Sequence, residues 1–159
     1  MPRPFPGAAL PPASTPPART ELPPPPPPPV TIEPVLAEVI ATALAQRGVP
    51  YRNGGSSPSG FDCSGFIQWV FAQHQTPLPR QTEAQYHAGT SVGLSKIQPG
   101  DLVFFETVSP GASHVGLAIG NDQFVHAPSS KGVVRVERYT AAYWSTRFVG
   151  ARRVVTITD

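Results

Sequence analysis

The sequence predicts an α+β domain in which helices pack on one face of an antiparallel sheet. Three observations point to this class. The chain has 159 residues, enough for one compact domain and too few for two ordinary ones. Apolar residues recur at helical spacing early in the folded region, whereas short strand-like runs fill its second half. Helices followed by a run of strands favour layers in which the two kinds of element are segregated.

Proline content separates this domain from the start of the chain. Fourteen of the 22 prolines lie in residues 1–29, and the last of them form the unbroken run Pro23–Pro29. Such a segment lacks both backbone donors and apolar bulk, so it cannot build a core. We therefore expect a proline-rich disordered linker at residues 1–29 and a folded domain at residues 30–159.

Three helices are expected before the strands. Apolar residues recur at helical spacing over residues 35–44, and Gly48 is placed to end this first helix. A second apolar helical face follows Asp62 and must end before Pro77, because proline cannot continue a helix. Residues 82–88 are expected to form a short third helix.

Strands dominate from residue 102 onward. Runs rich in Val, Ile and Phe alternate there with turn residues such as Gly, Asn and Asp. The expected strands are residues 102–106, 114–119, 123–127, 132–138 and 147–155. The segment between the first two helices, residues 49–60, is rich in Gly and Ser and is expected to be a loop.

The overall composition excludes several classes of protein. Twelve basic and ten acidic residues leave a net charge of +2, too small to indicate nucleic acid or a membrane surface as the main partner. Apolar runs stay well below the roughly 18 residues of a membrane span, so we expect no integral membrane segment. The single cysteine rules out an internal disulfide. Its thiol is then either a small buried hydrophobe or a reactive group.

Cys63 stands at a position that suits a reactive thiol. It lies in the stretch GFDCSGF, residues 60–66, in which Asp62 is a good N-cap residue. Cys63 then falls in the first helical turn, where the positive end of the helix dipole favours the thiolate over the thiol. The alternative is a core cysteine, which would need neither the acidic neighbour nor a histidine partner.

Two of the four histidines, His114 and His126, flank an expected β-hairpin whose turn is residues 120–122. With this three-residue loop Ile119 pairs with Gln123 and Leu117 with Val125, and the two histidines lie together on the face opposite the apolar one. A two-residue loop would shift the register by one residue and separate them. The arrangement predicts that His114 is the base for the cysteine and that His126 orients it. The alternative is two polar residues on a half-solvated face.

Seven sequence blocks, in order, resemble the NlpC/p60 family of cell-wall cysteine peptidases. They are Tyr51 with GG (54–55), GFDCSGF (60–66), LPR (78–80), QPGDLVFF (98–105), SHVGLAIG (113–120), FVHAP (124–128) and YWSTRFVGARRV (143–154). The resemblance implies a papain-like α+β fold with the nucleophile at a helix N-terminus. It also makes residues 30–159 an NlpC/p60 catalytic domain.

The resemblance assigns catalytic roles residue by residue. Cys63 corresponds to the family nucleophile, His114 to the general base and His126 to the third residue that orients the base. Tyr51 corresponds to the tyrosine whose hydroxyl lies near the nucleophile and helps the oxyanion site. The backbone N–H of Cys63 is a physically sensible second donor to that oxyanion.

Three polar residues near the nucleophile complete the candidate oxyanion and substrate-binding set: Asp62, Ser64 and Arg80. We expect Asp62 and Ser64 to shape the loop and to contact substrate amines. Arg80 is expected to pair with Asp62 or with a substrate carboxylate, the alternative being a purely structural ion pair. Asn53 departs from the aromatic or apolar residue that many relatives carry there, which leaves subsite preference open.

The resemblance implies hydrolysis of peptidoglycan stem peptides through a thioester acyl-enzyme. The bond usually cut joins γ-linked D-glutamate to diaminopimelate or lysine. No metal or other cofactor is implied. Two alternatives stay open: an amidase or acyltransferase on the same scaffold, and a non-catalytic module that binds the cell wall.

The implied substrate indicates that the protein is located in the cell envelope. It would be periplasmic or secreted, with anchoring to the envelope as a further option. The sequence starts with MPRPFPGAAL, which lacks the apolar stretch of a secretory signal. We expect a monomer that acts on stem peptides and binds no nucleic acid. Residues 1–29 have an alternative role as the ligand of a proline-recognising or wall-anchoring partner.

Overall fold

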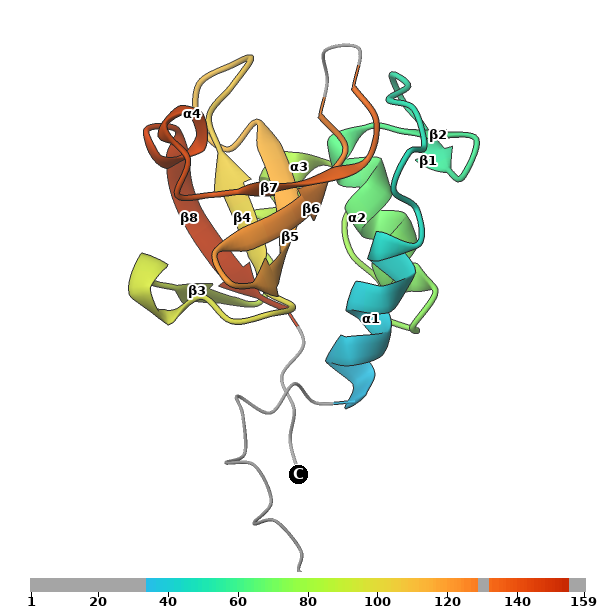
Figure 1. Ribbon diagram of the computed structural model, residues 1–159, viewed down its shortest axis with the longest axis horizontal. Coiled ribbons are helices and arrows are strands. Elements are labelled where there is room, and N and C mark those ends of the chain that lie inside the picture. Colours follow the sequence, from blue (N-terminus) through green and yellow to red (C-terminus); the bar gives the residue numbers. More distant parts are fainter. Residues whose placement is uncertain (1–33, 129–131, 155–159) are drawn as a thin grey trace, which may run out of the picture. The chain divides into compact units, whose positions relative to one another are not determined.

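The computed structural model describes residues 34–128 and 132–154. The expected linker, residues 1–29, lies outside these ranges. The described residues form several helices, a six-stranded antiparallel sheet and a small two-stranded sheet (Figure 1). Within the same ranges, no helix combines the length and the hydropathy needed to cross a membrane.

The expected helices are present: α1 (Pro34–Leu44), α2 (Cys63–Ala72) and α3 (Thr82–Gln85). Gly48 follows α1 with a φ of 96°, a left-handed conformation that ends the helical segment and that other residues rarely adopt. α3 is a single turn and ends earlier than the expected residues 82–88. A further one-turn helix, α4 (Ala142–Ser145), was not expected because a single turn shows no helical periodicity.

The main sheet has six strands in the order β3-β8-β4-β5-β6-β7, and every neighbouring pair is antiparallel. Its strands are β3 (Thr90–Val92), β4 (Leu102–Phe105), β5 (His114–Gly120), β6 (Gln123–His126), β7 (Arg135–Arg138) and β8 (Phe148–Arg153). The α+β class is therefore confirmed. β3 was not expected; it is three residues long and pairs with β8 at the edge of the sheet.

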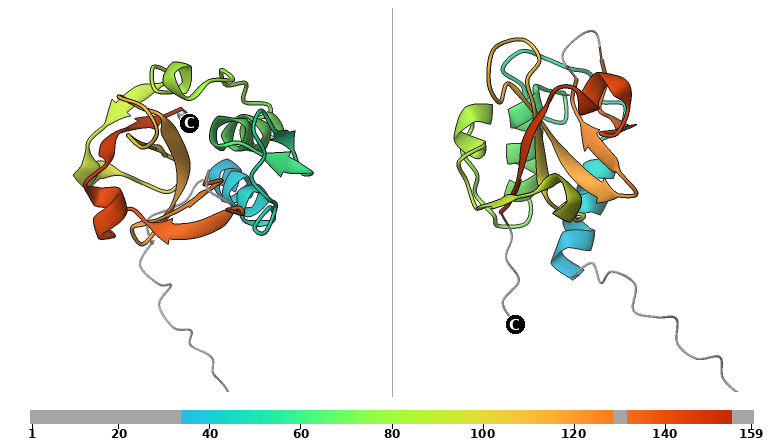
Figure 2. Two further views of the ribbon diagram at one scale, coloured as in Figure 1. Left: turned by 90° about the horizontal axis from the view of Figure 1, so that it is seen from above. Right: turned by 90° about the vertical axis from the view of Figure 1, so that its left-hand side faces the viewer.

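Both faces of the sheet are buried. Phe104 faces a core shared with α1 and α2, whereas its neighbour Phe105 faces a second core that contains Phe124 and Trp144. Successive strand residues point to opposite faces, so one β4 segment contributes to both cores. Figure 2 shows the sheet curving, with α1 and α2 together on one side of it. The short helix α4 thus packs on the second face of the sheet, where no helix was expected.

The turn between β5 and β6 differs from the expected three-residue loop. Gly120 pairs with Gln123, which leaves the two residues 121–122 as the turn. Both turn residues have positive φ, 56° and 61°, as in the tight turns that match the twist of a hairpin. The expected pairing of Ile119 with Gln123 is therefore wrong.

A β-bulge in β5 restores the register that the two-residue turn would have shifted. The register changes between Ala118 and Gly120, and beyond the bulge Leu117 lies opposite Val125, as expected. The extra residue in one strand compensates for the missing residue in the turn. His114 and His126 consequently come together although the loop has the length that was expected to separate them.

The expected loop over residues 49–60 contains a small second sheet. β1 (Ser56–Ser57) and β2 (Gly60–Phe61) form a short hairpin directly before α2. An isolated bridge joins Tyr51 to Phe61, and Phe61 is completely buried in the core that holds α2. This hairpin therefore fixes the backbone of Tyr51 next to the N-terminus of α2.

Candidate active site

Asp62 caps α2 and sets Cys63 as the first residue of the helix. Asp62 Oδ1 accepts a hydrogen bond from the backbone N–H of Gly65 at 2.6 Å, which satisfies one of the free donors at the helix N-terminus. Gly65 packs so close to the Gly55 carbonyl that a Cβ there would overlap it. The thiol is thus at a helix N-terminus that cap and backbone packing both hold in place.

The thiol of Cys63 is surrounded by α3 and by the start of β5. Its Sγ lies 3.5 Å from Thr82 Oγ1 and 4.0 Å from the carbonyl oxygen of Ser113. The backbone N–H of Val115 also approaches the sulfur. Cys63 is therefore held against the residues on both sides of His114. Among the described residues, no hydrogen bond joins the sulfur to the His114 ring itself.

Burial raises the pKa of the Cys63 thiol above its ordinary value. Hydrogen bonds from Thr82 and from the backbone N–H groups of Val115 and Ser64 act in the opposite direction, but the loss of hydration is the larger effect. Burial therefore outweighs the effect of the helix N-terminus, which was expected to favour the thiolate. The resting side chain is a thiol, and its proton must leave when it reacts.

His114 on β5 and His126 on β6 are hydrogen-bonded, with 2.7 Å between His114 Nε2 and His126 Nδ1. Both side chains are buried. Burial, followed by the charge of His126, lowers the pKa of His114 to about 3, and burial also lowers the pKa of His126. The pair is accordingly neutral at pH 7, with His114 Nδ1 as the nitrogen outside the pair.

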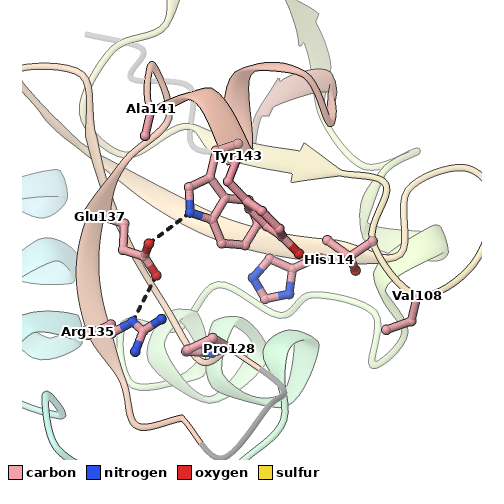
Figure 3. Close-up of a pocket in the computed structure, with 9 residues that line it drawn as sticks. Val108, His114, Pro128, Arg135, Glu137, Ala141 and Tyr143 are labelled. Atoms are coloured by element: carbon pink, nitrogen blue, oxygen red, sulfur yellow. Dashed lines mark hydrogen bonds and ion pairs between the residues drawn. The ribbon is translucent and has the colours of Figure 1, made fainter.

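Glu137 on β7 continues this pair, and the sequence did not single it out. His126 Nε2 lies 2.9 Å from Glu137 Oε2, the oxygen that also accepts from Arg135 Nε at 2.8 Å. Figure 3 shows the hydrogen bond between Arg135 and Glu137. Trp144 Nε1 donates to the other oxygen at 2.9 Å. These hydrogen bonds, led by that of His126, lower the pKa of Glu137 to about 2, so it is a carboxylate.

A sequence signal for Glu137 did exist. In β7 the polar residues Arg135 and Glu137 alternate with Val136, and β7 follows β6 as a hairpin partner. Because residues two apart share a face, either polar residue of β7 lies beside His126 once the two strands pair. The pairing of β6 with β7 therefore predicts a polar contact to His126.

Trp144 contacts both His114 and Glu137. Its ring stacks on that of His114, with 5.4 Å between centroids and an interplanar angle of 23°. The same indole donates its N–H to Glu137. Trp144 therefore excludes water from one face of His114 while its polar edge holds the carboxylate.

The structure brings the remaining candidates together beside Cys63. Arg80 donates to Asp62 Oδ2 at 2.8 Å and to Ser64 Oγ at 2.9 Å, so its expected pairing with Asp62 is present. Tyr51 is partly buried, and burial together with the nearby Cys63 and Asp62 raises the pKa of its hydroxyl. Asp62 thus serves α2 with one carboxylate oxygen and Arg80 with the other.

Two cavities flank this centre. One, of about 410 Å³, is lined by His114, Glu137 and Trp144 and by Tyr143 (Figure 3). The other, of about 540 Å³, is lined by Thr82 and Ser113, which contact the thiol. The exposed side chain of Val108 borders both cavities. His114 therefore lines one cavity, residues that contact the Cys63 thiol line the other, and Val108 borders both.

The part of the chain that the structure describes contains no cluster of side chains suited to bind a metal ion. No group of three or more His, Cys, Asp or Glu side chains is arranged there to hold a metal ion. His74, which is not part of the pair, instead bonds Thr42 of α1 at 2.7 Å. The reactive groups described above are the thiol of Cys63 and the neutral imidazole of His114.

Comparison with known proteins gives one consistent family. Residues 48–153 match the model of the NlpC/P60 family. The chain is 48% identical over 110 residues to a murein DD-endopeptidase/murein LD-carboxypeptidase, MepS, of Escherichia coli K12, which covers 69% of this chain and 57% of that protein. It is 38% identical over 120 residues to a gamma-DL-glutamyl hydrolase of Bacillus subtilis, across 73% of this chain and 29% of that one. The chain thus spans between about a third and somewhat over half of these relatives.

Solved structures agree with the sequence relatives. An NlpC/P60 family protein from Bacillus cereus superimposes with a TM-score of 0.72 at 31% identity, over 76% of this chain and 40% of that one. The NlpC/p60 domain of the peptidoglycan hydrolase SagA gives a TM-score of 0.65 at 35% identity, over 74% of this chain and 97% of that domain. The match with SagA extends over nearly the whole of the compared domain.

Proposed function

The chain belongs to the NlpC/P60 family, and on that premise we propose that it is a cysteine endopeptidase that hydrolyses the peptides of bacterial peptidoglycan. The observation that carries the proposal is the contact of Cys63, at the N-terminus of α2, with the strand that bears the His114–His126 hydrogen bond. Relatives named murein or peptidoglycan endopeptidases support the substrate class.

In the proposed reaction, attack and proton transfer occur together. The Cys63 sulfur attacks the carbonyl carbon while its proton passes to Nδ1 of His114, because the resting pair is neutral. The developing oxyanion accepts from the backbone N–H of Cys63 and from the Tyr51 hydroxyl. The imidazolium of His114 then gives its proton to the leaving amine, and a thioester to Cys63 remains.

Hydrolysis of the thioester completes the cycle. His114 Nδ1 takes a proton from water as the water attacks the thioester carbonyl, and it returns the proton to the Cys63 sulfur as the acid product leaves. His126 holds the far nitrogen of His114 through both steps. Every bond that forms and breaks is accounted for by these side chains and one water molecule.

Substrate contacts are proposed on both sides of Cys63. The cavities of about 410 and about 540 Å³ offer room for residues on either side of the cut bond. Asp62 and Ser64, held by Arg80, lie at the rim of the helix N-terminus, where Asp62 is suited to a substrate ammonium group. A substrate outside the cytoplasmic membrane indicates action in the cell envelope.

The bond we propose joins γ-D-glutamate to diaminopimelate or lysine in the stem peptide. The relative named gamma-DL-glutamyl hydrolase supports this choice. A bond between two D-centres is a second candidate, because the relative at 48% identity is named a DD-endopeptidase.

Mass spectrometry of defined muropeptides separates these possibilities. Wild type and Cys63→Ala are incubated with uncross-linked stem peptides and with cross-linked dimers. Cleavage after γ-D-glutamate by the wild type alone supports the first bond, and conversion of dimers to monomers supports the second. Release of the whole stem from the sugar would indicate an amidase, and a transferred acyl group an acyltransferase. Binding without any product, in both proteins, would leave a wall-binding module.

A further inference from the structure

We propose that Glu137 is a positioning residue of this site, fixing the tautomers of His126 and, through it, of His114, so that Nδ1 of His114 is bare and ready to take the thiol proton. The inference rests on the proposed roles of Cys63 and His114. It extends the predicted Cys63–His114–His126 arrangement by a carboxylate on a neighbouring strand.

The donor and acceptor inventory around Glu137 allows only one assignment. A carboxylate has acceptors alone, whereas the Nε of Arg135 and the Nε1 of Trp144 only donate. His126 Nε2, 2.9 Å from Oε2, must therefore carry a proton. In the neutral ring Nδ1 is then an acceptor.

The same reasoning passes from His126 to His114. Because His126 Nδ1 accepts, the atom 2.7 Å away, His114 Nε2, must carry a proton. The neutral His114 ring then has a lone pair on Nδ1. This is the tautomer that general-base catalysis at Cys63 requires, since the other would present an N–H to the thiol.

Burial of the two rings leaves no other arrangement of their protons. His126 is 0% and His114 4% exposed, so solvent offers little alternative hydrogen bonding to their rings. Glu137 is fixed by three donors, one each from β6, β7 and α4. A buried chain in which each group has one permitted orientation leaves the base preset before substrate arrives.

The charge of Glu137 has a second effect. It favours the imidazolium form of His114, which appears when the thiol proton is transferred, and so raises the pKa of His114 against burial. Among the described residues, Arg135 of β7 is the other charged group that acts on the histidine pair. Arg135 opposes the charged form of His126. Glu137 is thus the anion next to the pair that stabilises the proton-transfer state.

Glu137→Gln is an informative change because glutamine has nearly the same shape but one donor group. If its carbonyl faces His126 and Arg135, its NH₂ meets the indole N–H of Trp144. If its carbonyl faces Trp144, its NH₂ meets Arg135 and forces His126 to accept through Nε2, which reverses both tautomers. Neither orientation keeps all the hydrogen bonds of the carboxylate.

The first test measures the rate of Cys63 alkylation by iodoacetamide at pH 7 and pH 10 in the full-length protein. At pH 7 the proposed route passes the thiol proton to His114 as the sulfur attacks, whereas at pH 10 hydroxide removes that proton without the imidazole. Glu137→Gln is expected to lower the ratio of the rate at pH 7 to the rate at pH 10 by about 10-fold. This factor corresponds to a decrease of about one unit in the pKa of the His114 imidazolium. Glu38→Gln, on the exposed side of α1, is the charge-matched control and should keep the wild-type ratio.

The second test reads the tautomers directly from long-range ¹H–¹⁵N spectra of the four histidines. In wild type, His114 and His126 should each carry their proton on Nε2. In Glu137→Gln a share of the molecules should carry the proton on Nδ1 of both rings, and Glu137→Asp should restore the wild-type pattern in part.

These measurements need no peptide substrate, so they separate this inference from the proposed activity. A wild type that cuts no stem peptide but shows the expected ratio and tautomers would overturn only the substrate. An unchanged rate ratio in folded Glu137→Gln, or wild-type tautomers with Nδ1–H on His114, would overturn the role of Glu137. An equal loss at both pH values would also overturn it, since that is the signature of a merely structural residue.

Discussion

At the scale of single residues, the chemistry of Cys63 and His114 depends on burial more than on their charges. Burial raises the pKa of the thiol and lowers that of the imidazole to about 3. Both shifts oppose a resting thiolate–imidazolium pair. The catalytic advantage we propose therefore lies in a bare, oriented Nδ1 on His114, not in a preformed thiolate.

The pH dependence of kcat/KM should show this at low pH. A protonated imidazole cannot accept a proton, so activity falls as the pH drops through the pKa of His114. Because burial lowers that pKa to about 3, activity should persist at pH 5, where an ordinary histidine of pKa about 6.5 is mostly protonated. Rates between pH 4 and 8 on a neutral peptide substrate test this. An acidic limb centred near pH 6.5 would contradict it.

At the scale of elements, the N-terminus of α2 carries both the fold and the site. Asp62 uses one oxygen to cap the helix and the other to bind Arg80. Replacing it with alanine should reduce the free energy of unfolding by about 1 kcal/mol, the usual value of an N-cap. Asp62→Asn keeps an oxygen for the cap and should recover most of the loss. Urea unfolding at pH 7 compares the two, and equal losses would argue against the cap.

Gly65 offers a sharper test of the packing behind Cys63. Glycine to alanine inside a helix normally stabilises by up to about 1 kcal/mol. At Gly65 the added Cβ would overlap the Gly55 carbonyl, so Gly65→Ala should instead destabilise by about 1–3 kcal/mol. Gly93→Ala, which meets no atom within 4 Å, is the control and should change stability little. A neutral Gly65→Ala measured by the same unfolding experiment would mean that the two segments separate easily.

The β5–β6 hairpin shows what could and could not be predicted at this scale. The alternation of apolar residues predicted Leu117 opposite Val125, and this is confirmed. The turn was wrong because its residues adopt left-handed conformations and a bulge absorbs the difference, neither of which alternation reveals. The apolar face thus fixed the pairing where turn length alone would have misled.

At the scale of the whole molecule, contacts between distant segments account for most of what the sequence missed. The helices α1, α2 and α3, the five longer strands and the α+β class followed from local patterns. Thr82 beside Cys63 and Trp144 over His114 did not, because each joins segments far apart in the chain. The net direction of the Cys63 pKa shift did not follow either, because burial by several elements is not visible in a seven-residue motif.

The buried histidines also link stability to pH. A histidine whose pKa is lower in the folded state binds fewer protons there than in the unfolded chain, so stability falls as the pH drops below about 6.5. For His114 alone, the loss between pH 7 and 5 should be about 2 kcal/mol. Glu137 contributes little to this change, since the stability from its lowered pKa of about 2 is lost mainly below its unfolded value near 4.5.

Urea unfolding of wild type and His114→Gln at pH 7 and pH 5 measures this linkage. Glutamine does not titrate, so the variant should lose less stability than the wild type over the same interval. Equal losses in the two proteins would show that His114 is protonated as readily in the folded state as in the unfolded chain.

The most direct test of the central claim is the intact-protein mass during turnover. Wild type and Cys63→Ala are mixed with a stem peptide, quenched in acid within the first turnovers and weighed, and the modified segment is sequenced by fragmentation. We predict a wild-type species heavier by the acyl part of the substrate, with the added mass on Cys63, and none in Cys63→Ala. Product formation by Cys63→Ala at the wild-type rate, or an adduct on another residue, would contradict the assignment of Cys63 as the nucleophile.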